Sequence, residues 1–490
     1  MASSGSYSAG FGYGFATAQN PVWTLDQVLL ATGGRIVCGR YQAGFRSIST
    51  DSRAIEAGDL FLALEGERYD ALAFVEDVVN KGAAGVIVAR IPEVLPSVPV
   101  ILVDNTLKAL GDLAAYRRSL MRNLKVMAIT GSSGKTTVKE MVSTILETKM
   151  NVLKTRGNFN NLVGLPLSLL PVDYRHDVAV LEMGMNLPGE IARLTEIADP
   201  DIACINNIQG AHLQGLDDIE GVARAKGELF AGIKSWGKLV VNLDDQRVRR
   251  LVRKSPQEII SFGRNQKAFI RATHVKSLGA EGMVFTLHIG GNRARLKVKC
   301  FGQHNVLNSL AAAAMATCMR MNIDEIAHGL SAFTPYDKRM QVQKMAGGMM
   351  VVNDSYNANP ASMLAALETL QDLRRGRKSV VILGDMLELG RESVAAHRFV
   401  GETVARLKCD YLFALGSFAN NVTEAARKSG MVPRQARSFD GKSEIIDELN
   451  GLIKAGKITK GDWILVKGSR GMKMEDIIAD LELLEQGSKS

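Results

Sequence analysis

The stretch Ala128-Ile-Thr-Gly-Ser-Ser-Gly-Lys-Thr-Thr137 decides the fold of this chain. An apolar run, Val126–Ile129, leads into it, which predicts a strand, a glycine-rich turn and a helix from Lys135 to about Met150. Such a turn points backbone N–H groups at one place, and the N-terminus of the following helix adds partial positive charge, so the two together hold phosphate. In loops of this kind the lysine reaches the terminal phosphates, and the hydroxyl of the next residue, here Thr136, binds Mg²⁺.

The match to the common phosphate-binding loop is partial. In the pattern G-x-x-x-x-G-K-[ST] the first glycine would fall at Ile129, and Gly131 lies two places later. The alternative is a glycine-rich turn with an ordinary surface lysine, but strand, turn, lysine and paired threonines follow in the expected order. We therefore expect nucleotide binding, although phosphate binding alone names no reaction. The nucleotide-binding candidates of the loop are Gly131, Ser132, Ser133, Gly134, Lys135, Thr136 and Thr137.

Length and composition predict a cytoplasmic protein of about three domains. The 490 residues are 46% hydrophobic and 23% charged, as in ordinary globular proteins. No apolar stretch reaches the ~18 residues of a membrane-spanning helix, so we expect no membrane insertion. The first Lys or Arg is Arg35, so the basic flank of a secretory signal is missing. The five cysteines are scattered and never have C-x-x-C spacing, which favours a reducing compartment over a structural zinc site.

The net charge of +9 leaves two classes of partner open. A nucleic-acid-binding protein could have this charge, but here Lys and Arg form no tail or stripe with aromatic residues. A surface that receives polyanionic small molecules is also basic, because its charge steers the ligand. We expect no nucleic-acid partner.

The order of apolar segments predicts an α/β protein. Residues 1–21 contain no charged residue and are rich in Gly, Ser and Ala, which indicates a disordered tail. Residues 22–122 predict a small α/β domain that begins with a capping box at Thr24–Gln27, before a helix closed by Gly33-Gly34.

Residues 123–334 predict a central P-loop ATPase-type domain with a mostly parallel sheet and helices on both faces. Gly-rich turns between 268 and 301 indicate antiparallel strands at one edge, and the Ala-rich segment Asn305–Met321 indicates a buried helix. The expected parallel strands are Val126–Ile129, Asp177–Leu181, Ile202–Ile205 and Leu239–Asn242.

Residues 335–490 predict a second doubly wound, Rossmann-like domain, with Thr334-Pro335 as the hinge. Ligands of such sheets gather at the carboxyl ends of the strands. The expected strands are Val351–Asp354, Val380–Leu383, Leu412–Leu415 and Ile464–Val466.

Three residues of the central domain are considered for a functional role. Glu182 stands just past one strand, where a second Mg²⁺ contact is wanted beside the phosphate loop, although a strand-end Glu is usually solvated. His212 follows the next strand, and a loop His is more often structural, but its place at the same sheet edge favours function. Lys226 lies in a helix with one apolar face, and by itself it is best interpreted as a solvated surface residue.

Two segments of the third domain are candidates for ligand binding. Asp354 ends an apolar run and begins a loop crowded with hydrogen-bonding groups, although Asx-Pro segments are normally only turns. Lys467-Gly-Ser-Arg470 is a basic loop after a strand, and its arginine suits a carboxylate, which Arg binds in bidentate fashion.

Taken together, these motifs resemble those of the Mur ligases, over residues 22 to 484. The phosphate loop resembles the family's nucleotide motif, and Gly302-Gln-His-Asn-Val-Leu-Asn308 resembles its adenine-side motif. Asn353–Pro360 with Ser362, Gly384-Asp-Met-Leu-Glu-Leu-Gly390 and Lys467–Met472 resemble the branch that adds D-alanyl-D-alanine to UDP-N-acetylmuramoyl-tripeptide. One departure is Leu72, where many members of that branch have His, in a segment expected to contact the UDP-sugar.

The resemblance implies an ATP-dependent amide ligase that forms a peptidoglycan precursor through an acyl phosphate, with two Mg²⁺ ions and a carbamate on Lys226. It implies catalytic roles for Lys135, His212, Lys226 and Arg339, and metal ligands at Thr136, Glu182, His212 and Lys226. Further nucleotide contacts are implied at Asn305, Asn308, Arg339 and Asp354. Contacts to UDP-muramoyl-tripeptide or D-Ala-D-Ala are implied at Ser52, Arg53, Thr155, Asn158, Asn160, Asn161, Tyr356, Asn357, Asn359, Lys467, Ser469 and Arg470.

Two alternatives stay open at this point. The first is another amide ligase of the same superfamily, such as a folylpolyglutamate synthase-like enzyme, against which the Asn353–Pro360 and Lys467–Arg470 segments speak. The second is a nucleotide-driven binding module, in which ATP controls a partner and nothing is ligated. We expect a monomer, and the third residue of the tripeptide, lysine or diaminopimelate, is not readable from the sequence.

Overall fold

The computed structural model describes residues 23–39, 44–66, 69–210, 213–216, 218–335 and 337–487. The chain divides into two compact units, Met1–Tyr116 and Arg117–Ser490. The predicted tail 1–21 and the candidate His212 lie outside the described residues. Within the described residues, no helix is long and apolar enough to cross a bilayer.

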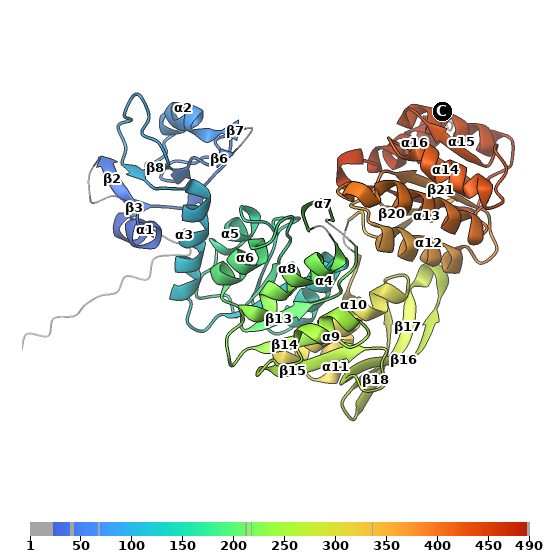
Figure 1. The fold of residues 1–490 in the computed structure, drawn as a ribbon, viewed down its shortest axis with the longest axis horizontal. Coiled ribbons are helices and arrows are strands. Elements are labelled where there is room, and N and C mark those ends of the chain that lie inside the picture. Colours follow the sequence, from blue (N-terminus) through green and yellow to red (C-terminus); the bar gives the residue numbers. More distant parts are fainter. Residues whose placement is uncertain are drawn as a thin grey trace, which may run out of the picture. The chain divides into compact units, whose positions relative to one another are not determined.

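The first unit is a small α/β domain around a five-stranded sheet in the order β2-β9-β8-β5-β4 (Figure 1). The predicted capping box is confirmed, because Thr24 and Gln27 bond each other's backbone N–H groups and Gly33 closes the helix in the left-handed conformation. Leu72 packs against the apolar core of this unit. Its elements are β1 (Trp23–Thr24), α1 (Leu25–Thr32), β2 (Arg35–Cys38), β3 (Gly44–Phe45), β4 (Ile48–Ser49), β5 (Leu60–Leu62), β6 (Glu65–Gly66), β7 (Tyr69–Asp70), η1 (Ala71–Phe74), α2 (Val75–Asn80), β8 (Gly85–Val88), β9 (Val100–Leu102) and α3 (Thr106–Leu120).

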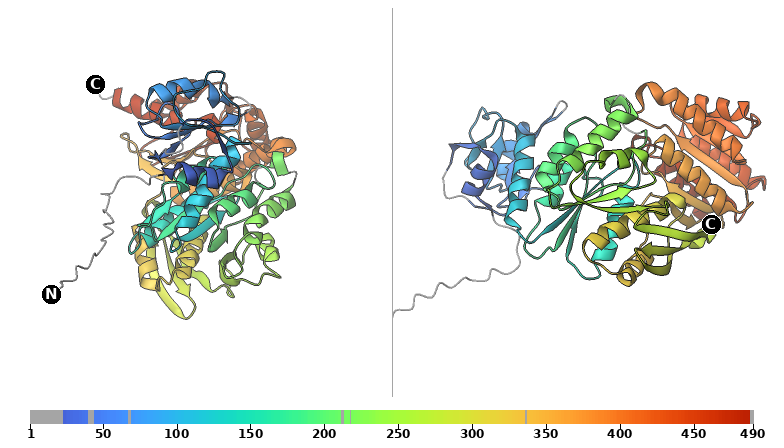
Figure 2. Two further views of the ribbon diagram at one scale, coloured as in Figure 1. Left: turned by 90° about the vertical axis from the view of Figure 1, so that its left-hand side faces the viewer. Right: turned by 60° about the horizontal axis from the view of Figure 1, so that its bottom comes forward.

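The second unit begins with a nine-stranded sheet in the order β11-β12-β10-β13-β14-β15-β16-β17-β18. The pairing is parallel from β11 to β16 and antiparallel from β16 to β18, which confirms the predicted parallel sheet with an antiparallel edge. The antiparallel strands form the yellow-green ribbons of Figures 1 and 2. The strands are β10 (Lys125–Thr130), β11 (Val152–Lys154), β12 (Val178–Glu182), β13 (Ile202–Ile205), β14 (Lys238–Asn242), β15 (Glu258–Gly263), β16 (Ile270–Ser277), β17 (Met283–Ile289) and β18 (Asn292–Val298).

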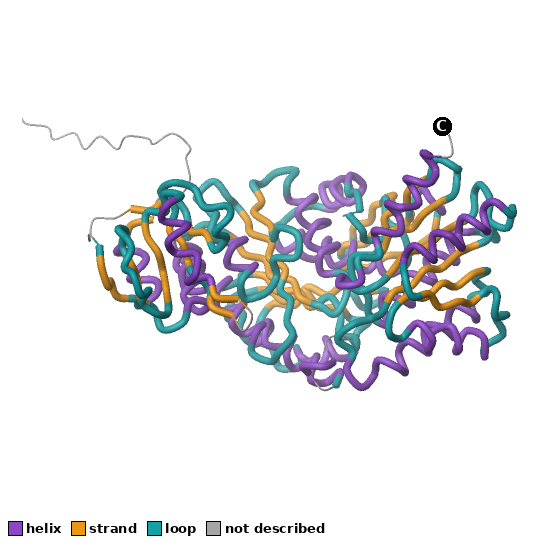
Figure 3. Tube along the Cα trace, turned by 90° about the horizontal axis from the view of Figure 1, so that it is seen from above, coloured by secondary structure: helices purple, strands orange, loops and turns teal. Residues whose placement is uncertain are grey.

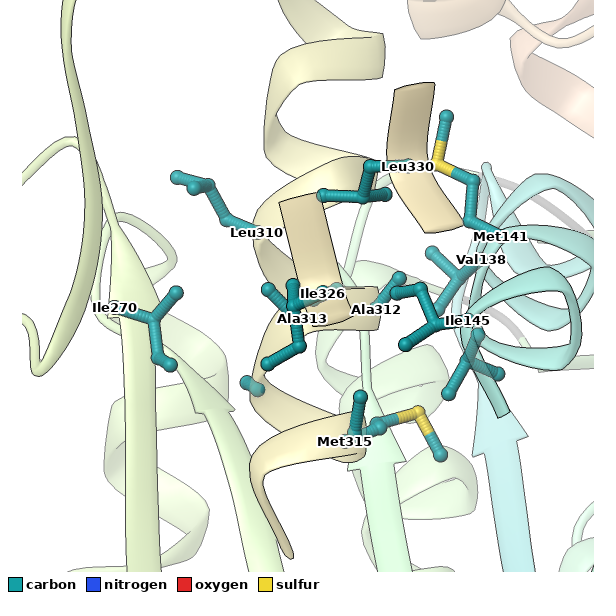
Figure 4. Close-up of a cluster of buried hydrophobic side chains, with 14 of the residues drawn as sticks. Val138, Met141, Ile145, Ile270, Leu310, Ala312, Ala313, Met315, Ile326 and Leu330 are labelled. Atoms are coloured by element: carbon teal, nitrogen blue, oxygen red, sulfur yellow. The ribbon is translucent and has the colours of Figure 1, made fainter. Parts of the chain in front are cut away.

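Helices cover both faces of this sheet because its central strands β10, β12, β13 and β14 are buried on both faces. One face packs on α4, α10 and α11, and α10 is buried as predicted, because its alanines let it lie close to α4 (Figure 4). The other face packs on α6 and α8. The helices are α4 (Lys135–Leu146), α5 (Gly164–Leu169), α6 (Glu190–Ala198), α7 (Leu213–Leu216), α8 (Ile219–Ala231), α9 (Gln246–Leu251), η2 (Gly279–Glu281), α10 (Gln303–Cys318) and α11 (Ile323–Ala332).

A six-stranded sheet in the order β19-β20-β24-β21-β22-β23 follows, parallel except for β19, as expected for a doubly wound domain. One face packs on α12, α13 and α14, and the other on α15 and α16, so strands lie between helices in Figure 3. The elements are β19 (Gln341–Lys344), β20 (Met350–Asp354), α12 (Pro360–Arg374), β21 (Ser379–Gly384), η3 (Gly390–Glu392), α13 (Ser393–Arg406), β22 (Tyr411–Leu415), α14 (Ala419–Lys428), β23 (Ala436–Phe439), α15 (Lys442–Lys454), β24 (Trp463–Lys467), η4 (Arg470–Met472) and α16 (Glu475–Gly487).

Three local expectations need correction. The helix after the phosphate loop ends at Leu146 and not near Met150, because turns bonded to Leu146 and Ile145 replace the last helical turn. Glu182 and Lys467 are the last residues of β12 and β24 and not loop residues, because parallel pairing with Ile129 and Asp354 extends each strand by one position.

The contact between α4 and α11 generates a stability prediction. A Cβ at Gly329 of α11 would lie 2.6 Å from the Cα of Ile145, a backbone atom of α4. We expect Gly329→Ala to lower the free energy of unfolding by about 1–3 kcal/mol, because overpacking outweighs the gain in helix propensity. The measurement is denaturant unfolding combined with hydrogen exchange of α4 and α11.

The matched control is Gly451→Ala, at a helical glycine of α15 whose added Cβ would meet no atom within 4 Å. This change should stabilise by about 0.5–1 kcal/mol through helix propensity alone. Equal stabilisation by both substitutions would show that the helices do not pack as closely as described.

Candidate active site

A cavity of about 770 Å³ lies in the second unit, where the carboxyl ends of parallel strands from both of its sheets meet. Residues after β10, β12, β13 and β14 form one part of its wall, and residues after β20, β21 and β24 form the other. This is where parallel α/β sheets bind ligands, because backbone N–H groups and helix N-termini converge there. The cavity is lined by most of the predicted nucleotide and acceptor residues.

The phosphate loop is shaped by two asparagines that follow β13. Asn207 accepts hydrogen bonds from the Ser133 N–H at 2.9 Å through its side chain and from the Ser132 N–H at 3.0 Å through its carbonyl. Gly134 has φ +78° at the N-terminus of α4, and a Cβ there would lie 2.6 Å from Asn206 Nδ2. Only glycine fits this position without a clash. The shortened loop is therefore a tight, well-defined turn that precedes the helix.

Lys135, the first residue of α4, lies half-buried at the cavity. Its ammonium donates a hydrogen bond of 2.7 Å to the Gly131 carbonyl, so it curls back over the loop. Burial lowers the pKa of Lys135, the nearby Glu182 carboxylate raises it, and the Arg339 charge lowers it. A phosphate in the loop would replace the carbonyl as the partner of this cation.

Glu182 and Thr136 meet beside Lys135. The Thr136 hydroxyl donates to Glu182 Oε2 at 2.7 Å, and the Asn160 amide donates to Oε1 at 2.7 Å. Thr155 does not line the cavity; its hydroxyl accepts from the Glu182 N–H at 2.9 Å, and its carbonyl accepts from the buried Lys139 ammonium at 2.8 Å. The segment that begins at Thr155 therefore supports the Glu182 carboxylate from behind.

A chain of buried amides joins α10 to the phosphate loop. Asn305 donates to the Phe301 carbonyl at 2.8 Å and accepts from Asn308 at 2.9 Å. Asn206 donates to Asn308 at 2.9 Å and to the Ser133 carbonyl at 3.0 Å. Both predicted adenine-side asparagines thus lie in the cavity wall within one network, which rigidifies this end of the site because every amide has a partner.

The opposite wall contains an ion pair between two predicted ligand-binding residues. The buried Lys467 ammonium lies 2.6 Å from Asp354 Oδ2 and donates to the Asn357 carbonyl at 2.8 Å. Asp354 also accepts from the Met340 N–H at 3.0 Å, which fixes the turn after Arg339. The two charges largely neutralise each other, so this pair organises the wall.

Arg339 and Tyr356 form a second contact of this wall. The Arg339 guanidinium lies 3.9 Å from the centre of the Tyr356 ring, a cation–π contact, and its buried Nε has no hydrogen-bond partner in the described residues. Arg470 lies 6.0 Å from the same ring and pairs with Glu475 at 2.5 Å. Two guanidinium groups therefore lie near one aromatic ring at the cavity.

Asn359 and Ser469 have structural partners at the cavity edge. Asn359 caps α12 in a capping box with Ser362, and its amide donates to the Ser132 carbonyl of the phosphate loop at 3.4 Å. The buried Ser469 hydroxyl accepts from the Leu387 N–H at 2.9 Å. Asn158 and Asn161 line the other part of the wall, and Asn161 accepts from the Gly164 N–H at 2.8 Å.

The interpretation of Lys226 as a solvated surface lysine is wrong, because this residue of α8 is only 1% exposed. Its Nζ lies 4.0 Å from the sulfur of Met185, which lines the cavity. Burial lowers the pKa of Lys226 well below its ordinary value, and the Lys135 charge lowers it further. Lys226 therefore lies behind the cavity wall as a poorly solvated amine.

Ser52 and Arg53 belong to the first unit. Ser52 is buried, and its carbonyl accepts from the Lys81 ammonium at 3.0 Å. Arg53 is exposed and pairs with Asp51 at 2.8 Å. Their expected contacts to the UDP-sugar stay predictions.

Sequence reasoning missed several cavity residues that lie beyond β13 and β14. Asp245 accepts from the Ile208 N–H at 2.7 Å and caps α9, so it joins the loops after both strands. The sequence did contain a pattern that could have identified them, since polar residues directly follow two predicted parallel strands. The missed lining residues include Asn206, Asn207, Gln209, Asp244, Asp245 and Arg247 of the loops that follow the two strands and of α9, together with Asn242 at the end of β14 and His304 of α10.

The described residues contain no group of three or more His, Cys, Asp or Glu side chains that could hold a metal by themselves. The Thr136–Glu182 oxygen pair nevertheless fits Mg²⁺, which is usually bound by one or two carboxylates together with substrate phosphates and waters.

Comparisons with known proteins agree over most of the chain. Family models match in three places: "Mur ligase family, catalytic domain" at residues 45–118, "Mur ligase middle domain" at 129–316 and "Mur ligase, glutamate ligase domain" at 338–470. A relative from Bacillus subtilis (strain 168), named UDP-N-acetylmuramoyl-tripeptide--D-alanyl-D-alanine ligase, is 37% identical over 450 residues and covers 90% of this chain and 94% of its own.

Solved structures give the same result. MurF from Acinetobacter baumannii superposes with a TM-score of 0.87 at 34% identity and covers 95% of this chain and 100% of that one. MurF from Thermotoga maritima, solved in complex with ADP, has a TM-score of 0.80 at 26% identity, with 90% and 98% covered. From these matches and the motifs that line its cavity, we conclude that this chain belongs to the Mur ligase family, as a ligase of the MurF type.

Proposed function

We propose that this enzyme joins D-alanyl-D-alanine to UDP-N-acetylmuramoyl-tripeptide, with ATP as the energy source, in the cavity of the second unit. The observation that supports this most is that one cavity is lined by the phosphate loop, by the Thr136–Glu182 pair and, on the opposite wall, by Tyr356 and Arg470. The proposed nucleotide and acceptor residues line one cavity of the chain, and we expect the enzyme to act as a monomer. A cytoplasmic location suits an enzyme that consumes ATP.

The reaction begins when the terminal carboxylate of the tripeptide attacks the γ-phosphorus of ATP. This bond forms as the bond to the ADP oxygen breaks, which yields an acyl phosphate and ADP. The amine of D-alanyl-D-alanine then attacks the acyl carbon, phosphate leaves with the bonding pair, and the amine loses a proton as the amide forms.

The main physical obstacle is the approach of two anions. Unit charges of like sign at 4 Å repel by ~1 kcal/mol in water and by ~4 kcal/mol at an effective dielectric of 20. Lys135 reduces this repulsion from the phosphate loop, and Arg339 from the opposite wall. Because Arg339 Nε lacks a partner within the described residues, this guanidinium has a donor left for a phosphate oxygen.

Thr136 and Glu182 would hold one Mg²⁺ ion. When bound, the metal would supply positive charge to the phosphate oxygens. Asn160 keeps Glu182 Oε1 in place, and Thr155 holds the backbone of the same residue, so the carboxylate presents one defined edge. His212 and Lys226 are the proposed ligands of a second ion.

Lys226 would have to become an oxygen ligand for this purpose. A neutral, buried amine attacks CO₂ to form an N–C bond, and loss of a proton leaves a carbamate anion. The burial of Lys226 and the lack of an oxygen partner among the described residues both favour the neutral amine. Carbamate oxygens then suit a hard cation, as the ammonium does not.

His304 is a cavity residue that we exclude as the base for the acceptor amine. Burial lowers the pKa of its imidazole to about 4, while Asp354 raises it and Lys467 lowers it. A base of such low pKa accepts protons poorly near neutrality. His304 therefore stays neutral beside the nucleotide residues Asn305 and Asn308.

The proposed function is tested by phosphate release from ATP in the presence of Mg²⁺, with UDP-muramoyl-tripeptide and D-alanyl-D-alanine added singly and together. We expect release to require both, with a UDP-linked pentapeptide as the product by mass spectrometry. Lys135→Ala should lose at least ~100-fold in rate without loss of fold, because it removes a preorganised charge at the transferring phosphate. Lys428→Ala, at an exposed lysine of α14, is the matched control and should be fully active.

Two results would contradict this proposal. Release that ignores D-alanyl-D-alanine would favour another acceptor, or a nucleotide-driven binding module. Full activity of Lys135→Ala would remove the phosphate-loop assignment.

The role of Lys226 predicts chemical rescue. Lys226→Ala should be nearly inactive and should regain part of its activity with added acetate or formate, because a small carboxylate can replace the carbamate oxygens. In the wild-type protein, ¹³CO₂ should give a carbamate carbon signal by NMR that the variant lacks. Wild-type turnover by the variant without any addition would show that Lys226 is not a ligand.

The low pKa of His304 predicts that the free energy of unfolding depends on pH. Its pKa of about 4 in the folded state lies below the ordinary value of 6.5, so between these values the unfolded chain binds a proton that the folded chain does not. Stability should therefore fall as pH drops from 6.5 to 4, and His304→Gln should make this fall shallower. Urea unfolding at several pH values measures the difference, and identical slopes in both proteins would refute the assignment.

A further inference from the structure

The loop that follows β21, Asp385–Leu389, is held by side chains from other elements. It belongs to the motif Gly384-Asp-Met-Leu-Glu-Leu-Gly390, whose residues the proposed reaction does not use. Two successive backbone N–H groups of the loop, at Met386 and Leu387, are each bonded by a buried side chain from elsewhere in the fold. Such a loop has one defined conformation, because releasing either N–H would leave a buried group unpaired.

His397 of α13 provides the first of these bonds. Its Nε2 lies 2.9 Å from the Met386 nitrogen, and its Nδ1 lies 2.6 Å from the Ser393 carbonyl oxygen. A backbone N–H can only donate and a carbonyl can only accept, so Nε2 must be the acceptor and Nδ1 must hold the proton. The imidazole is 1% exposed and stacks on Phe418 at 4.5 Å between ring centres. Both nitrogens are thus used, and the ring position is defined.

Asp385 and Ser469 hold the two sides of the same loop. The buried Asp385 carboxylate accepts from the Ser417 N–H at 2.7 Å and the Phe418 N–H at 3.1 Å, which joins the loop to the turn after β22. The Ser469 hydroxyl accepts from the Leu387 N–H at 2.9 Å, and the Ser469 N–H donates to the Asp385 carbonyl at 3.0 Å. The loops after β21, β22 and β24 are therefore locked together.

The residues of the loop that lie past these bonds form part of the cavity wall. Leu387, Glu388 and Leu389 line the cavity on the same side as Arg470. Glu388 has φ +64°, a left-handed conformation that is uncommon for a residue with a side chain and persists only where the surroundings impose it. Its carbonyl accepts from the Gln214 N–H at 3.3 Å. The direction of these side chains thus depends on how Met386 and Leu387 are held.

We propose that His397 is a positioning residue for the acceptor dipeptide: through Met386 it sets the loop that forms the acceptor wall of the cavity. His397 itself touches no substrate. This inference rests on the proposed function, in which the dipeptide binds on the side of Tyr356 and Arg470, away from the phosphate loop. Loss of the Met386 bond should weaken acceptor binding and leave nucleotide binding unchanged.

Two substitutions separate the bonds made by His397. In His397→Gln the side-chain oxygen can take the place of Nε2 and accept from the Met386 N–H. In His397→Asn the shorter amide can take the place of Nδ1 and donate to the Ser393 carbonyl, but it cannot reach Met386. We expect Asn to raise the KM for D-alanyl-D-alanine about five- to tenfold, as for loss of one hydrogen bond, and Gln to stay within about twofold of wild type. The KM for ATP should not change in either variant.

Hydrogen exchange provides a readout that does not depend on activity. The peptide containing Met386 should exchange faster in His397→Asn than in wild type and at the wild-type rate in His397→Gln. Phe418→Leu is the matched packing control, because it removes the stacking partner and keeps both hydrogen bonds of the imidazole. It should leave the acceptor KM near wild type. If His397→Asn does not fold, Asp385→Asn, which removes one of two accepted N–H bonds, should raise the acceptor KM in the same selective way.

The outcomes separate this inference from the proposed function. Equal effects of Gln and Asn, a parallel rise in the KM for ATP, or the same effect from Phe418→Leu would overturn the positioning role. Absence of any requirement for D-alanyl-D-alanine in the wild-type enzyme would overturn the proposed function. In that case the exchange rates of the Met386 peptide would still test whether His397 holds the loop.

Discussion

The parallel pairing of β10 with β12 and β13 is the constraint on which the site depends. It places Ile129 opposite Glu182 and Thr130 opposite Ile205, so the phosphate loop, Glu182 and Asn206 all emerge at one edge. The 2.7 Å hydrogen bond between Thr136 and Glu182 is a direct result of this register. A shift of one residue would turn the Glu182 side chain to the other face of the sheet.

The cavity combines charges of both signs, and hydrogen bonds decide which of them are available to ligands. Lys467 and Asp354 neutralise each other at 2.6 Å, so they define the wall and add little field. Lys135 and Arg339 are positioned from two different sheets, with a carbonyl and an aromatic ring as their neighbours. Within the described residues neither cation forms an ion pair at salt-bridge distance, so both can respond to phosphate. The basic net charge of the chain acts at longer range, by steering anionic ligands.

Support behind the cavity wall matters as much as the residues on it. Thr155 and Lys139 hold Glu182 from behind, and the amides of Asn305, Asn308 and Asn206 link α10 to the phosphate loop. His397 and Asp385 do the same for the loop after β21. In each case the buried polar group has a hydrogen-bond partner, so removing one of the two leaves the other unpaired and disturbs the wall.

The sequence by itself determined the α/β class, the mostly parallel central sheet, the phosphate loop and the buried Ala-rich helix. These features depend on local patterns: apolar runs of strand length, glycine where φ is positive, and alanine where helices lie close. The capping box at Thr24 was readable for the same reason. The family could also be recognised, because its motifs are short and ordered along the chain.

Only the tertiary structure decided which polar residues face a ligand and which face the protein. Lys226 has the sequence context of a solvated helical lysine and is buried, because α8 packs on the sheet with that face inward. Ser469 and Asn359 are in motif segments and nevertheless bond to backbone, and Thr155 lies behind Glu182 and not in the cavity. Pairing between Asp354 and Lys467, or between Leu387 and Ser469, joins positions far apart in the chain. Such contacts follow from how sheets and helices pack, and local patterns contain no information about partners at that distance.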